Sequence, residues 1–95
     1  MEKAIQQLIE KLSHVPTIKR IILFGSRARN DAEDRSDIDI AIDCPTATDL
    51  EWTHIYFIAD EIDTLLKIDM IRYDTASQEL REKIQLEGKV LYERH

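Results

Sequence analysis

The residues best suited to chemistry are Asp37 and Asp39, which flank Ile38 at the start of an alternating apolar run. Because side chains alternate across a β-strand, both carboxylates would lie on one face, with their Cβ atoms roughly 6–7 Å apart. In a half-buried place, each negative charge would oppose the ionisation of the other. A divalent cation would supply the missing positive charge, and Mg²⁺ prefers carboxylate oxygens. The spacing therefore predicts a Mg²⁺ site on this strand.

A third aspartate, Asp69, lies in another strand candidate, residues 67–73. If that strand lies beside the first one in the sheet, a third carboxylate joins Asp37 and Asp39 on the same face. Three carboxylates can hold two metal ions about 3.5–4 Å apart, the arrangement that serves phosphoryl and nucleotidyl transfer. These three aspartates are the candidate metal ligands and catalytic residues.

A turn upstream of the aspartates suits the same chemistry. Gly25 has no Cβ, so a phosphate could approach the backbone, and Ser26 offers a hydroxyl and a backbone N–H. If the chain is helical from Arg27 onward, the free N–H groups of that helix also favour an anion. Arg27 and Arg29 could neutralise part of the phosphate charge. We therefore expect a triphosphate to bind beside Gly25 and Ser26.

Each of these signals also has a purely structural interpretation. An Asp-x-Asp pair at a strand start is common, Asp69 alone could be a solvated edge residue, and Gly-Ser marks an ordinary turn in most proteins. Asp43, farther along the acidic face, is more simply explained as a solvated residue than as a ligand. The combination of these signals is more specific than any one of them.

Hydrophobic periodicity places these residues on an alternating series of helices and strands. The predicted order is α-β-α-β-α-β-α-β, which is an α/β fold with one small sheet covered by helices. The expected ranges are 2–13, 18–24, 27–36 (a short helix, then a loop), 37–42, 48–66, 67–73, 75–88 and 90–92. Two capping boxes are predicted, Thr48 with Glu51 and Thr75 with Gln78. Gly88 is well placed to end the last helix.

The helix after Thr48 carries the clearest apolar stripe in the chain. The residues expected to pack on the sheet are Ile55, Ile58, Ala59, Ile62, Leu65 and Leu66. Phe57 falls opposite this stripe, with Trp52 and Tyr56 at its edge. Exposed aromatic residues often anchor interfaces, so we expect Phe57 to contact a partner or a second copy of the chain. A single exposed apolar residue is also normal on a protein surface.

Composition limits the classes of protein that the chain can represent. Its 95 residues fit one domain, residues 1–95, and its net charge of −6 argues against sequence-independent binding of nucleic acid. There is no apolar run long enough to span a membrane. A single cysteine, Cys44, cannot form an internal disulfide, which fits a reducing cytoplasm.

The combination of Gly25-Ser26, Asp37-Ile38-Asp39 and a strand aspartate at Asp69 resembles the polymerase-beta nucleotidyltransferase superfamily. Within it, the segments "LFGSRAR", "SDIDIAI" and "KIDMI" resemble the minimal nucleotidyltransferases, or MNT domains. The resemblance covers nearly the whole chain and implies a polymerase-beta-like fold, with a small mixed sheet covered by helices. One departure is Asn30, which stands where the family turn has glycine; asparagine also tolerates a left-handed backbone.

The resemblance implies a role for each candidate residue. Asp37 and Asp39 would hold the catalytic metals, and Asp69 would complete the metal site and help to activate the attacking hydroxyl. Gly25 and Ser26 would bind the triphosphate. MNT proteins often act with a small all-helical HEPN protein, as antitoxin and toxin. The implied reaction is transfer of a nucleoside monophosphate, usually AMP from ATP, to a hydroxyl such as a tyrosine of that partner.

Two other functions stay open at this point. The chain could be an antitoxin that neutralises its partner by contact alone, with a vestigial site, or a transferase for a small molecule such as an antibiotic. The three aspartates favour an enzyme, because a binding module has no need of three like charges on one face. The lack of room for an acceptor domain counts against the small-molecule transferase.

Overall fold

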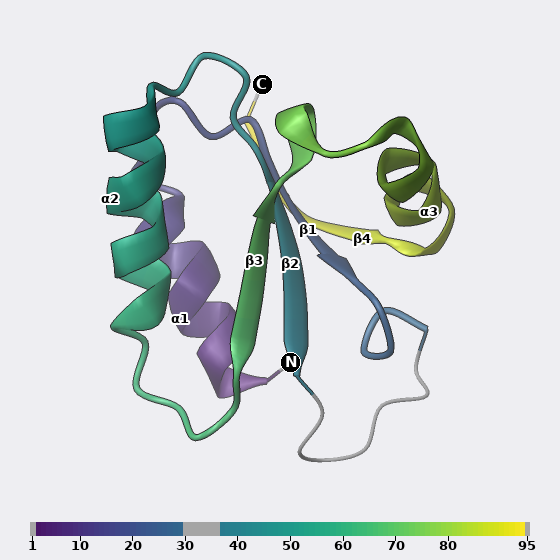
Figure 1. The fold of residues 1–95 in the computed structure, drawn as a ribbon. Coiled ribbons are helices and arrows are strands. Elements are labelled where there is room, and N and C mark those ends of the chain that lie inside the picture. Colours follow the sequence, from purple (N-terminus) through teal and green to yellow (C-terminus); the bar gives the residue numbers. More distant parts are fainter. Residues whose placement is uncertain (1, 30–36, 95) are drawn as a thin grey trace.

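The computed structural model describes residues 2–29 and 37–94 of the chain. Four strands form one sheet in the order β3-β2-β1-β4 (Figure 1). The elements, in chain order, are α1 (Lys3–Leu12), β1 (Arg20–Phe24), β2 (Ile38–Asp43), α2 (Asp49–Asp60), β3 (Ile68–Arg72), a short 3-10 helix (Tyr73–Thr75), α3 (Gln78–Glu87) and β4 (Lys89–Glu93).

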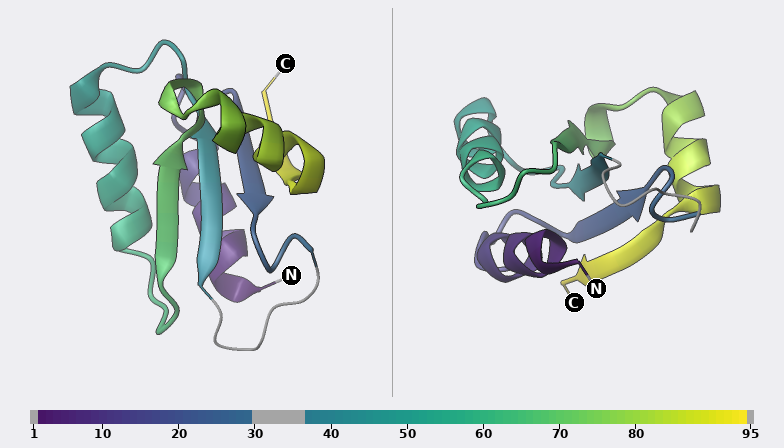
Figure 2. Two further views of the ribbon diagram at one scale, coloured as in Figure 1. Left: turned by 45° about the vertical axis from the view of Figure 1, so that its right-hand side comes forward. Right: turned by 90° about the horizontal axis from the view of Figure 1, so that it is seen from below.

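The sheet contains both parallel and antiparallel pairs. Its strand order determines which of the strands with candidate residues are neighbours. β1 lies in the interior and pairs antiparallel with both β2 and β4. β2 and β3 are parallel, and α2 forms the crossover between them. Figure 2 shows α1 and α2 on one side of the sheet and α3 on the other. The candidate residues therefore lie within a three-layer arrangement.

Alternation along β2 divides its side chains between two apolar clusters. Ile38, Ile40 and Ile42 are fully buried in the larger cluster, which includes residues of α1 and α2. Ala41, on the opposite face, joins a smaller cluster with Tyr73 and with Ile84 of α3. The acidic residues of β2 share the face of Ala41, because side chains two residues apart point the same way.

The capping box that begins α2 is confirmed. The Thr48 Oγ1 accepts a hydrogen bond from the Glu51 N–H at 3.1 Å, and the Glu51 carboxylate accepts one from the Thr48 N–H at 3.2 Å. The predicted extent of this helix is wrong at its end, because α2 stops at Asp60. Beyond it, the Thr64 hydroxyl accepts from the Leu66 N–H at 3.1 Å, a local bond that competes with helical pairing.

The apolar stripe of α2 is confirmed for its helical part only. Ile55 and Ala59 are buried, and Ile62 is buried in the turn that follows the helix. Leu65 was expected on the sheet but is fully exposed, at 106% of its reference surface. Helical periodicity fails there because the chain has already left the helix at Asp60.

The second predicted capping box is also wrong. Thr75 lies in the 3-10 helix, and Ser77 is the residue that caps α3, accepting from the Leu80 N–H at 3.2 Å. Gly88 ends α3 as predicted, but in an extended conformation with φ −74°. A Cβ at Gly88 would clash with the Ile84 carbonyl oxygen, so close packing explains this glycine.

The predicted short helix over residues 27–36 is described only in part. Residues 26–29 form a turn, in which the Gly25 carbonyl accepts from the N–H groups of Ala28 at 3.1 Å and Arg29 at 3.2 Å. Asn30 and the rest of that prediction lie outside the described residues.

The end of β4 is tied to the segment between α1 and β1. The Arg94 N–H donates to the Lys19 carbonyl at 2.8 Å, and its guanidinium donates to the Ser13 carbonyl at 3.0 Å. The Tyr92 hydroxyl lies 3.5 Å from the same Ser13 carbonyl. The last strand thus closes the N-terminal part of the chain onto the sheet.

Candidate active site

Asp39 and Asp69 lie directly opposite each other on neighbouring strands. They are paired in the parallel register of β2 and β3, so their side chains emerge on the same face of the sheet. The expectation that the strand of Asp69 lies beside that of Asp39 is confirmed. Asp37 is exposed and stands just before β2, while the Ile38 N–H beside it donates to the Lys67 carbonyl at 2.9 Å.

Gly25 lies against the Asp39 side chain, on the side of β1. It follows Phe24, which pairs with Asp39 in the β1–β2 register, and it has a φ of +75°. That backbone conformation is unfavourable for residues with a Cβ. A Cβ at Gly25 would also collide with the Asp39 carboxylate. Glycine is therefore required here both by the backbone and by the close approach of an acidic side chain.

The two arginines of the turn are oriented by carboxylates from both helical layers. Arg27 lies 3.9 Å from the Glu2 carboxylate, just before α1, and Arg29 lies 3.1 Å from the Glu87 carboxylate at the end of α3. Both arginine side chains belong to the turn that follows Gly25. Ser26 is half-buried on the same turn. The triphosphate-binding role of these residues stays a prediction.

Like charges set the electrostatics of this face. Burial is the main cause that raises the pKa of Asp39, and the negative charges of Asp69 and Asp37 raise it further. Arg29 and Lys67 oppose the shift with their positive charges. Lys67 also forms an ion pair with Asp69, with 3.4 Å between Nζ and Oδ1. Negative charge thus predominates at the place where a cation was predicted.

The donor set fits a hard divalent cation, although the side chains are not arranged as a finished site. Among residues 2–29 and 37–94, no three or more His, Cys, Asp or Glu side chains are placed so that they could hold a metal ion. The Asp69 carboxylate forms its ion pair with Lys67, and like charges on one face oppose the close approach of the other two carboxylates. Carboxylate oxygens are nevertheless the donors that Mg²⁺ prefers. The three aspartates remain the predicted ligands.

Sequence reasoning missed Lys67, whose ammonium group pairs with Asp69. The two residues are separated by one position, which on a strand puts side chains on the same face, so the spacing was an available signal. It also missed Glu2 and Glu87 as partners of the arginines. Those contacts join segments far apart in the sequence, and no local pattern reports them.

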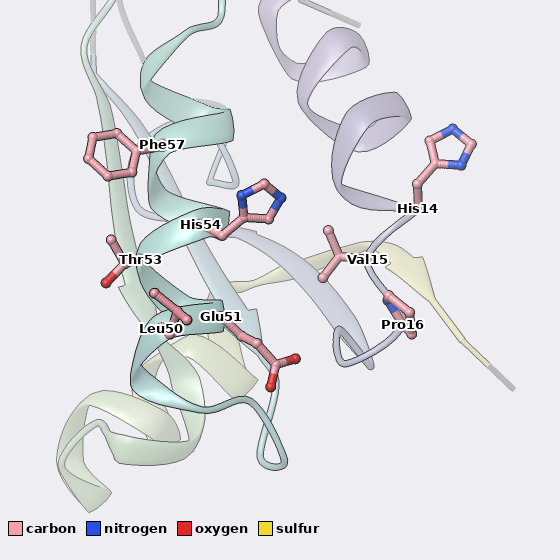
Figure 3. A pocket seen from close by; sticks show the side chains of 8 residues that line it. All are labelled: His14, Val15, Pro16, Leu50, Glu51, Thr53, His54 and Phe57. Atoms are coloured by element: carbon pink, nitrogen blue, oxygen red, sulfur yellow. The ribbon is translucent and has the colours of Figure 1, made fainter.

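An apolar pocket of about 580 Å³ lies away from the aspartates, between α2 and the segment that follows α1 (Figure 3). Its lining residues are His14, Val15, Pro16, Leu50, Glu51, Thr53, His54 and Phe57. Phe57 is 58% exposed, as expected from its place opposite the buried stripe. The predicted interface residue therefore belongs to a pocket that is separate from the candidate active site.

Comparison with known proteins decides the family. Residues 6–95 match the family model described as polymerase beta, nucleotidyltransferase. The chain belongs to this nucleotidyltransferase family. The mixed four-stranded sheet and its helices agree with the polymerase-beta-like fold, so the expected fold class is confirmed.

One curated relative of this nucleotidyltransferase comes from Methanocaldococcus jannaschii. It is named "Putative protein adenylyltransferase", is 35% identical over 103 residues, and the match covers 96% of this chain and 97% of the relative. The match thus spans nearly the full length of both chains.

Solved structures add chains from toxin–antitoxin complexes. One, described as a toxin–antitoxin with AMP-PNP, is 26% identical with a TM-score of 0.69, over 97% of this chain and 73% of that chain. Another is a tri-AMPylated Shewanella oneidensis HEPN toxin in complex with an MNT antitoxin, at 25% identity and a TM-score of 0.61, over 95% and 67% of the two chains. The resemblance to MNT antitoxins is therefore confirmed. No helix in the described part of this nucleotidyltransferase has the length and apolar character of a membrane span.

Proposed function

We propose that this nucleotidyltransferase moves AMP from ATP, in a Mg²⁺-dependent reaction, to a tyrosine hydroxyl of a HEPN-type helical partner, and so acts as an antitoxin. The observation that carries the proposal is the register of Asp39 against Asp69, with Gly25 held against the Asp39 carboxylate. The named relatives support the choice of AMP and of the partner, since one is named for protein adenylylation and another pairs an MNT antitoxin with an AMPylated HEPN toxin.

The reaction follows from the groups on this face. The acceptor hydroxyl oxygen forms a bond to the α-phosphorus of ATP, and the bond from that phosphorus to the bridging oxygen breaks, so that pyrophosphate leaves with the electron pair. Asp69 is the candidate to take the hydroxyl proton. When bound, Mg²⁺ supplies charge neutralisation and Lewis-acid polarisation at the reacting phosphate, and Asp37, Asp39 and Asp69 are the residues that would hold it.

The turn after β1 would hold the rest of the nucleotide. Gly25 lets the phosphates approach the backbone, and Ser26 offers a hydroxyl and an N–H to them. Arg27 and Arg29 lie on the same turn and would neutralise part of the triphosphate charge. These roles require both arginines to exchange part of their present carboxylate contacts for phosphate.

The test combines the purified chain with the product of the neighbouring gene, ATP and Mg²⁺, and reads the intact mass of both proteins. We expect the partner to gain the mass of one or more AMP groups, on a tyrosine that peptide mapping identifies. The Asp39→Asn variant is the control and should leave the partner unmodified. A partner that gains AMP equally from both forms would contradict the assignment of the site.

Neutralisation of a partner by contact alone is the second candidate function. The exposed Phe57 and its apolar pocket favour it, because they offer a binding surface that does not include the aspartates. The two candidates separate cleanly in one assay. If Asp39→Asn still neutralises the toxicity of the partner in cells, contact is sufficient and the transfer reaction is not required. A cytoplasmic location suits either candidate, since Cys44 is a free thiol.

A further inference from the structure

β3 forms one edge of the sheet, and no strand pairs with its outer side in the described ranges. On its inner side, the Lys67 carbonyl just before the strand accepts a hydrogen bond from β2 at 2.9 Å. Backbone N–H and C=O groups of successive strand residues point in alternate directions. Those of Asp69 and Ile71 therefore face β2, and those of Ile68 and Met70 face outward with no partner strand.

A groove of about 520 Å³ is lined by residues of β3 and α2, which lie side by side in Figure 1. Residues of α2 and the turn after it form one wall: Tyr56, Ala59, Asp60, Ile62 and Thr64. Consecutive residues 66–71 form the other wall. Because alternate side chains leave a strand on opposite faces, a groove that touches all of them must pass over the backbone edge itself. Its volume lies in the range of roughly 300–1,000 Å³ that is typical of ligand sites.

The groove leads directly to the candidate active site, because Asp69 lines it. In a strand paired to the outer edge of β3, the residue opposite Asp69 would place its side chain on the aspartate face. Directly opposed Cβ atoms in paired strands lie about 4.5–5.5 Å apart. A hydroxyl on that side chain would therefore lie within reach of the Asp69 carboxylate.

We propose that the β3 edge binds an extended peptide segment by strand addition and presents a hydroxyl side chain of that segment to Asp69. The segment belongs to the protein acceptor, and for this identity the inference rests on the proposed function. Alternating unpaired N–H and C=O groups are matched by a peptide backbone, the known mode of β-augmentation. Asp60 and Asp69 in the groove disfavour a nucleic-acid phosphate backbone. A second copy of β3 is disfavoured as well, because antiparallel pairing would bring its acidic residue near Asp69.

The test uses the isotope-labelled chain and two capped pentapeptides of sequence Thr-Val-Tyr-Val-Thr, one with a normal backbone and one N-methylated at alternate residues. With the normal peptide, the amide signals of Ile68 and Met70 should shift, while the Asp69 and Ile71 amides stay protected from hydrogen exchange. N-methylation removes donors and should weaken binding by roughly tenfold or more. Equal binding of both peptides, or shifts confined to the pocket around Phe57, would overturn the proposal.

A backbone variant tests the same edge from the side of the protein. Met70→Pro removes an outward N–H but no bond to β2, so the variant should fold and lose the peptide response. Ile71→Pro removes an inward N–H and is expected to disrupt the sheet. If Met70→Pro also unfolds, the peptide pair decides alone. Separate measurement of AMP transfer distinguishes the two proposals. If transfer occurs and the peptide has no effect on Ile68 and Met70, only the peptide-binding proposal is contradicted. If the peptide binds and no transfer occurs, only the proposed reaction is contradicted.

Discussion

At the scale of single residues, the most informative feature is the electrostatic cost of Asp39. Its carboxylate is partly buried, lies beside the end of β1, and faces Asp69 across the β2–β3 register. Burial and two neighbouring acids raise its pKa, so the folded chain gains nothing from its ionised form. A position of this kind persists in a stable fold when it serves a ligand rather than the fold.

We predict that Asp39→Asn stabilises the metal-free chain at neutral pH. Because the folded pKa of Asp39 is raised above its ordinary value of 3.8, its contribution to folding stability is complete below that value. The contribution is lost as the pH rises through the raised pKa. Asparagine carries no such loss, so the variant gains on the parent as the pH rises, by at most about 1 kcal/mol for a partly exposed group. Urea unfolding at about pH 3.5 and about pH 7 measures this.

The same variant separates a metal ligand from a surface acid. Mg²⁺ should raise the unfolding temperature of the parent and leave that of Asp39→Asn unchanged, since a ligand stabilises only the form that binds it. AMP transfer should be lost in the variant. A variant that still responds to Mg²⁺ as the parent does would show that Asp39 is no ligand.

We predict that Gly25→Ala damages both the fold and the site. Alanine would be strained at φ +75° and its Cβ would meet the Asp39 carboxylate, so we expect a loss of about 1–3 kcal/mol in stability. AMP transfer per folded molecule should also fall, because the carboxylate must move. Gly88→Ala is the matched control: its Cβ would meet the Ile84 carbonyl oxygen and the Ile22 side chain instead of an aspartate, so it should cost stability without lowering transfer per folded molecule. Equal transfer losses in both variants would argue against a specific role of Gly25.

At the scale of elements, α2 borders two separate hollows of the surface. Its capping box fixes where the helix begins, and Ile55 and Ala59 bury the inner side. The outer side carries Leu50, Tyr56 and Phe57, each more than half exposed. Tyr56 lines the groove beside β3, whereas Leu50 and Phe57 line the apolar pocket near the end of α1. One helix thus borders two surfaces that could receive different parts of a partner.

We predict that Phe57→Ser leaves the fold and Mg²⁺ binding intact and weakens association with the partner, or self-association, by at least about tenfold, the loss of 1.4 kcal/mol or more expected for an aromatic anchor. Leu86→Ser is the control, because Leu86 is 87% exposed on α3, the helix on the other side of the sheet. Titration calorimetry and size-exclusion chromatography measure the two kinds of association. Identical results for parent, variant and control would assign Phe57 to ordinary surface.

Local patterns predicted the elements well where one local interaction decides them. The Thr48 cap, the alternation around Asp39 and the stop at Gly88 all depend on neighbours within a few residues, and each was found. The end of α2 was missed because apolar residues continue at helical spacing beyond Asp60, where the chain has left the helix and Thr64 instead accepts from the Leu66 N–H. The α3 cap was missed because Thr75 and Ser77 are both suitable caps, and the 3-10 helix before α3 decides between them.

At the scale of the whole molecule, the sequence predicted that the strands of Asp39 and Asp69 are neighbours, but not the contacts around them. Asp39 and Asp69 could be placed together because strands separated by one helix tend to be neighbours and parallel. The ion pairs of Arg29 with Glu87 and of Arg27 with Glu2 depend on how α3 and α1 meet the turn. Such tertiary contacts depend on how the helices pack on the complete sheet, and no local sequence pattern predicts them.

The net charge of −6 predicts salt-dependent association with a basic partner. Opposite net charges accelerate encounter, and salt screens the attraction beyond about 10 Å at 0.1 M. We expect the association rate constant to fall several-fold between about 50 and 200 mM salt, with a smaller change in the dissociation rate constant. Stopped-flow fluorescence of Trp52 measures both rates. An association rate that salt leaves unchanged would show that charge does not guide the encounter.

The pairing of β4 with β1 also has a consequence for folding during synthesis. β1 lies between β2 and β4, so the strand that precedes Gly25 keeps one unpaired side until β4 has left the ribosome. Arg94 then joins the carbonyls of Ser13 and Lys19, contacts that span most of the chain. Such distant pairings form late. The sheet can therefore be completed only after β4 has been synthesised, and until then β1, which leads into the Gly25 turn, lacks one of its two neighbouring strands.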